Sequence, residues 1–74
     1  MTPNEIHKLS LQERKTLAQN PNTPYQVLDI LAKDEYTYVR RWVAKRSKNI
    51  TIDQLLILGQ DEDEDVRQAA LGRL

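Results

Sequence analysis

The side chains that could do chemistry lie in two charged clusters. The first is an acidic run, Asp61 to Asp65, whose aspartates stand at positions 1, 3 and 5 of an EF-hand-type calcium loop. Such a loop also needs glycine at position 6 and glutamate at position 12, where this chain has Val66 and Gly72. We therefore expect no calcium site. We interpret the acids as favouring the positive end of the helix that follows, with an acidic docking patch as the alternative.

The second cluster is basic, and its five cations fall between Arg40 and Lys48. On a helix, Arg41, Lys45 and Lys48 share one outward stripe, which a solvated face or a protein-docking face would both explain. Arg40 follows a valine, as Arg67 does, and we expect it to pair with Asp34 or with an acid of a neighbouring unit. Gripping nucleic-acid phosphates is the alternative. The zero net charge and the acidic run count against it, because nucleic-acid-binding domains are usually basic overall.

Little else in the chain suggests catalysis or metal binding. His7 is the only histidine and has no second ligand at helical spacing, there is no cysteine, and only two glycines are present. We predict a non-enzymatic protein without catalytic residues, cofactor or metal. The sequence also lacks an apolar run of about 20 residues and a signal-peptide pattern at its start. We therefore expect no membrane association and a cytoplasmic location.

The charged side chains must be carried by regular elements, and the chain is rich in residues that start helices. Capping boxes are predicted at Thr2, Ser10, Thr23 and Thr51, each with Glu or Gln three residues later. Apolar residues follow at helical spacing, and no sustained alternation indicates a strand. The predicted helices cover residues 3–9, 11–19, 24–33, 37–46, 52–60 and 64–73.

The sequence also repeats itself. A shift of 27 residues brings Asn22 onto Asn49, Leu28 onto Leu55, and Val39-Arg40 onto Val66-Arg67, and a shift of 26 brings Arg14 onto Arg40. The pattern predicts one domain over residues 1–74, made of a partial repeat (1–19) and two full repeats (20–46 and 47–74). We predict an all-α fold, a short right-handed α-solenoid of about 2.5 to 3 helix pairs, because such a pair hides its apolar face only by stacking.

The run NPNTPYQVL, followed by LAKD and VRRWVA, resembles the leucine-rich repeat variant, a bacterial relative of HEAT and armadillo repeats. The resemblance implies paired helices, the second short and partly 3₁₀, and it suggests binding without fixing a ligand. Founding members of that family carry an iron–sulfur cluster in a separate cysteine-rich segment. This chain has no cysteine, so that feature does not carry over.

These observations lead to three functional hypotheses. The first is a protein–protein interaction module, with the candidate partner-binding residues Arg41, Trp42, Lys45, Arg46 and Lys48. Trp42 is predicted to face the core, or else to be a partly exposed anchor. Self-association through ends bearing Ile57, Leu71 and Leu74 belongs to this hypothesis. The second is a small nucleic-acid-binding accessory protein that uses the Arg40–Lys48 face. The third is a structural spacer without a site of its own.

Overall fold

The computed structural model describes residues 2–74, which form six α-helices and no β-strand. In chain order the helices are α1 (Pro3–His7), α2 (Leu11–Gln19), α3 (Tyr25–Leu31), α4 (Thr37–Arg46), α5 (Ile52–Leu58) and α6 (Glu64–Leu71). The expectation of an all-helical chain is therefore confirmed.

Three of the four predicted capping boxes are present. Thr2, Ser10 and Thr51 each accept a hydrogen bond from the backbone N–H three residues on, and the Glu or Gln at that position bonds back to the cap. The box predicted at Thr23 is wrong. The Thr23 hydroxyl donates to the Leu17 carbonyl at 2.6 Å, so it closes the previous loop, and α3 begins one residue later with Pro24 as its cap.

The helices end earlier than predicted in four of six cases. The helices over 11–19 and 37–46 have the expected bounds, whereas α1, α3, α5 and α6 are each two residues shorter at the C-terminal side. A residue in the right-handed helical conformation closes all four of these ends, namely Lys8, Ala32, Gly59 and Gly72. Gly59 is thus a cap residue that follows α5 and does not lie in the helix interior, where a glycine would be unfavourable.

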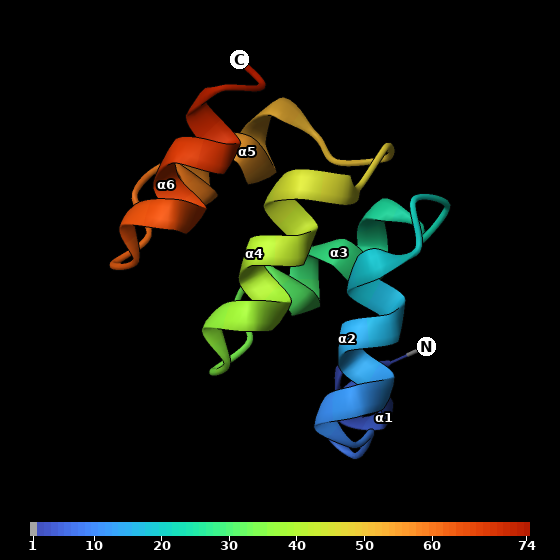
Figure 1. Ribbon diagram of the computed structural model, residues 1–74. Helices are drawn as coiled ribbons and strands as arrows, with labels where there is room; N and C mark the ends of the chain where they lie inside the picture. The colour runs from blue at the N-terminus through green and yellow to red at the C-terminus, as the bar shows by residue number, and fades with distance from the viewer. Residues whose placement is uncertain (1) are drawn as a thin grey trace.

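The helices pack in two rows (Figure 1). Helix α4 packs against α2 on one side and α6 on the other, while α1 and α3 are neighbours in the second row. The pairs α3–α4 and α5–α6 each pack together, so consecutive helices belong to opposite rows. The core between the rows is made of aliphatic side chains, among them Ile6, Leu28, Leu31, Val39, Val43, Leu58 and Val66.

Positions that the internal shift makes equivalent have similar surroundings. Leu28 and Leu55 are both buried in the core, and the Asn49 amide donates to the carbonyls of Asn22 and Thr23, linking the corresponding loops. Not every apolar side chain of α2 is buried, since more than a third of the surface of Leu11 is exposed.

Candidate functional site

Some basic side chains of the predicted basic face form ion pairs within the chain, and the others face solvent. Arg40 belongs to the first group, as expected. Its Nε donates to Asp61 Oδ2 at 2.8 Å, and its Nη1 donates to the Asp34 carbonyl at 2.6 Å. The residue is only 7% exposed, so Arg40 holds α4 against the loop before α6 and is not available to a partner.

Arg41 is also engaged, contrary to the expectation of an outward stripe. Its Nη2 lies 3.1 Å from Asp65 and 3.9 Å from Asp63, and its guanidinium stacks 5.4 Å from the Tyr38 ring centroid. Asp63 caps α6 by accepting from the Val66 N–H, which confirms that the acidic run serves the helix start. The acids thus neutralise both arginines at the N-terminal end of the basic cluster.

The remaining predicted residues lie toward the C-terminal end of α4. Trp42 is half-buried, with its ring packed on the core and Arg46 stacked 5.4 Å from the ring centroid. Trp42 therefore packs on the core, as the first prediction has it, but it is not fully buried, and its role as a binding anchor stays a prediction. Lys45, Arg46 and Lys48 are exposed. The structure brings these cations to one end of α4.

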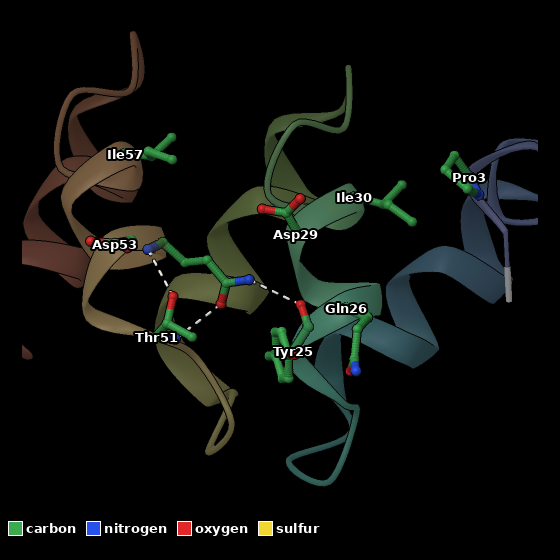
Figure 2. A pocket seen from close by; sticks show the side chains of 9 residues that line it. Pro3, Tyr25, Gln26, Asp29, Ile30, Thr51, Asp53 and Ile57 are labelled. Carbon is green, nitrogen blue, oxygen red and sulfur yellow. Dashed lines mark hydrogen bonds between the residues drawn. The ribbon is translucent and has the colours of Figure 1, made fainter.

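A hollow lies on the opposite row, between α1, α3 and α5 (Figure 2). This groove has a volume of about 610 Å³, and its lining residues are Pro3, Tyr25, Gln26, Asp29, Ile30, Thr51, Asp53, Gln54 and Ile57. Ile57 projects from α5 toward α3, and Ile30 projects from α3 toward Pro3. Tyr25 is 52% exposed and Ile57 50% exposed, so two large apolar side chains are open to a ligand.

Hydrogen bonds fix the spacing of the groove walls. The Gln54 amide of α5 donates to the Tyr25 carbonyl at 2.9 Å, while its backbone N–H donates to the Thr51 hydroxyl at 3.1 Å (Figure 2). One glutamine thus completes the cap of α5 and ties α5 to the start of α3. Because its side chain is buried and bonded at both ends, the floor of the groove is preorganised.

The charge of the groove is negative. Asp29 and Asp53 line it, and no lysine or arginine does. Lys33 reaches Asp29 only at 3.9 Å, and both side chains are more than half exposed, so this pair leaves the carboxylate open to a competing cation. The groove offers apolar contact together with two carboxylates, which suits an apolar segment with a positive charge.

Sequence reasoning singled out Ile57 as poorly buried but did not find the groove. A signal was present, because Ile30 and Ile57 are separated by the same 27 residues as the other matched positions. Ile57 is half exposed, and Ile30 is only partly buried against the core. Two apolar residues at equivalent, incompletely buried positions indicate a second apolar surface. Tyr25, Asp29 and Asp53 carried no such signal, because exposed polar or aromatic residues are common on helices.

In the part of the chain that the structure describes, the fold does not bring the histidine or the acidic residues together into a metal site. His7 is exposed, as predicted, and within residues 2–74 no three His, Cys, Asp or Glu side chains gather in a way that would hold a metal ion. In the same part of the chain, no helix has both the length and the apolar character needed to cross a membrane.

No known protein family, curated protein or solved structure matches the chain. The resemblance to the leucine-rich repeat variant therefore stays a prediction.

Proposed function

We propose that the chain is a short α-solenoid that serves as a protein-interaction module. Its groove between α3 and α5 binds a segment of a partner protein that carries an apolar side chain and a lysine or arginine. The observation that carries this proposal is the groove itself, in which exposed Tyr25 and Ile57 stand beside Asp29 and Asp53, with no lysine or arginine among the described lining residues.

Two further features support the solenoid and the binding role. Helices alternate between two rows, and matched positions such as Leu28 and Leu55 are buried alike, which is how stacked helix pairs hide their apolar faces. The groove walls are held by Gln54, so a ligand would not have to order them. A preformed, partly apolar surface with a few placed polar groups is typical of binding sites.

The proposal replaces the face first predicted, Arg41 to Lys48, as the main partner surface. Arg41 is occupied by Asp63 and Asp65, and Arg46 covers the open side of Trp42. Lys45, Arg46 and Lys48 are exposed but do not line the groove, so this proposal gives them no contact with the bound segment. Nothing in the geometry favours nucleic acid over protein, since two of the five cations already have carboxylate partners.

Selection from a random peptide library displayed on phage would test the proposal. We expect enriched sequences to place one or two large apolar residues next to Lys or Arg. Fluorescence anisotropy of a selected peptide should then show weaker binding by Ile57→Ser and by Asp29→Asn/Asp53→Asn. Raising the salt concentration should also weaken it, because exposed charges are screened.

The matched control is Lys45→Ala/Lys48→Ala, which alters exposed residues of the other row and should leave peptide binding unchanged. Ile57 is half exposed, so its replacement should leave the fold intact, and circular dichroism would verify that. Enrichment of acidic peptides, or binding that ignores Ile57→Ser, would contradict the proposed site.

A further inference from the structure

Three arginines at equivalent positions form what we call the arginine ladder: Arg14 on α2, Arg40 on α4 and Arg67 on α6. The Nη1 of each donates to a carbonyl of the loop that precedes its own helix, namely that of Leu9, Asp34 and Asp61, at 2.6 to 2.7 Å. The first contact is therefore the same in all three helix pairs.

The second contact reaches into the following helix pair. Arg14 Nε lies 2.8 Å from Asp34 Oδ2 as an ion pair, and Arg40 Nε lies 2.8 Å from Asp61 Oδ2. Each aspartate uses its Oδ1 to accept a backbone N–H two residues on, at 3.0 Å for Asp34 and 2.9 Å for Asp61. The loop therefore presents the other carboxylate oxygen to the arginine of the preceding pair.

Arg67 makes the first contact but not the second. Within residues 2–74 it forms no ion pair, whereas Arg14 and Arg40 are both buried against a carboxylate. One helical turn after Arg67, the same face of α6 carries an exposed leucine. Leu71 stands 27 residues after Ala44, which is fully buried beneath the next helix pair, yet Leu71 is 53% exposed. Leu74 adds a further exposed side chain at the same end.

We propose that this end face of α6, made of Arg67, Leu71 and Leu74, docks a helix pair of a partner protein. The loop of that pair presents an aspartate to Arg67 Nε, and its second helix packs on α6 as α6 packs on α4. Charge complementarity identifies the occupant, because the ladder contact that Arg67 lacks is the one that Asp34 and Asp61 provide to the other two arginines.

A second copy stacked head to tail does not supply that aspartate. The residue equivalent to Asp34 in the first helix pair, at the shift of 26, is Lys8. Its ammonium would meet the Arg67 guanidinium, and like charges in contact disfavour such an interface. This surface is separate from the groove, so its test is independent of the groove experiment.

Extending the chain with a helix pair of the stated chemistry tests the proposal. A copy of residues 48–74 joined after Leu74 carries the copied Asp61 in the required position, as a surrogate for the partner. In NMR spectra, hydrogen exchange of the Arg67 Nε–H should slow at least tenfold relative to the 74-residue chain, approaching the rate for Arg40. The α6 amides should slow as well.

The copied Asp61 decides whether the ladder contact is responsible. Asp61→Asn in the copied segment should return the Arg67 Nε–H to fast exchange, whereas Asp53→Asn in the copied segment, a matched loss of charge on an exposed site, should not. Unchanged exchange of Arg67 on extension, or equal effects of the two variants, would overturn the proposal. A dimer of the 74-residue chain in sedimentation that Leu71→Glu dissolves would also overturn it, because the occupant would then be a second copy.

Discussion

Replacing Asp61 with asparagine should remove the charge opposite Arg40 while leaving the loop intact. Asparagine can still accept the Asp63 N–H with its side-chain oxygen, as Asp61 Oδ1 does at 2.9 Å. What is lost is the carboxylate 2.8 Å from Arg40 Nε, where both side chains are 9% exposed. The variant therefore isolates the cost of a buried guanidinium without its partner.

Breaking one side of a buried ion pair costs about 3 to 5 kcal/mol, because the remaining charge stays desolvated. We expect the lower end of that range, since Glu62 lies 3.6 Å from Arg40 Nη2 and compensates in part through a side chain that is 89% exposed. A loss of about 3 kcal/mol would lower the melting temperature of a domain this size by roughly 12 to 24 °C.

Urea unfolding followed by far-ultraviolet circular dichroism would measure the change in the free energy of unfolding. Asp65→Asn is the matched control, because Asp65 also pairs with an arginine of α4, at 3.1 Å, but its side chain is 71% exposed. That variant should cost less than about 1 kcal/mol. Equal losses in the two variants would show that burial of the Arg40 pair does not determine its contribution.

Three further outcomes are expected. Hydrogen bonds from the backbone N–H and the side chain of Ser10 hold the pKa of Glu13 below its ordinary value of 4.5. The Glu13 carboxylate therefore stabilises the fold at pH values above 4.5, and this contribution is lost as the pH falls through the lowered pKa. In urea titrations, the stability difference between wild type and Glu13→Gln should shrink between pH 7 and pH 3. Gly59→Ala should raise the free energy of unfolding by about 0.4 to 1 kcal/mol, since its φ is −66°. The new methyl would meet the Leu55 carbonyl oxygen at 3.3 Å and Leu71 Cδ2 at 2.9 Å, and Leu71 is an exposed side chain whose end can move. A loss of stability would show that these neighbours are held in place. Thr23→Val should cost about 1 to 3 kcal/mol in thermal melts, because it leaves the Leu17 carbonyl without its 2.6 Å partner. An unchanged melting temperature would show that this hydrogen bond does not stabilise the fold.

The sequence was sufficient to predict the helices and most of their starts, because both depend on local chemistry. Ser10 with Glu13, and Thr51 with Gln54, form boxes over four residues that need no tertiary context. Thr23 shows where local reasoning fails. The same residue pattern was present, but the Leu17 carbonyl on the preceding helix competed successfully for the hydroxyl. Helix ends were also overestimated, since the packing partner decides where a short helix stops.

The candidate site was harder to predict, because the sequence shows which residues are charged but does not show which of them are exposed to a partner. The cations between Arg40 and Lys48 form a conspicuous cluster in the sequence, and only the fold places Asp61, Asp63 and Asp65 against two of them. Arg40 was correctly paired with an acid of the neighbouring unit because it fell on a repeated position. Arg41 does not fall on a repeated position. Its partners depend on how closely α4 and α6 approach each other, and residue spacing in the sequence does not give that distance.

The acidic and basic clusters of this chain also lie against each other in the fold. Carboxylates at the start of α6 and in the preceding loop are matched to guanidinium groups of α4, so the two charged clusters offset each other within the fold. The surfaces left for partners are those where the matching is incomplete. One is the groove, which has Asp29 and Asp53 and no lysine or arginine among its described lining residues. The other is the face of α6 that carries Arg67, which forms no ion pair within residues 2–74. These two surfaces differ in sign and lie on different helices, so they call for different partners, a basic apolar segment for one and an aspartate-bearing helix pair for the other.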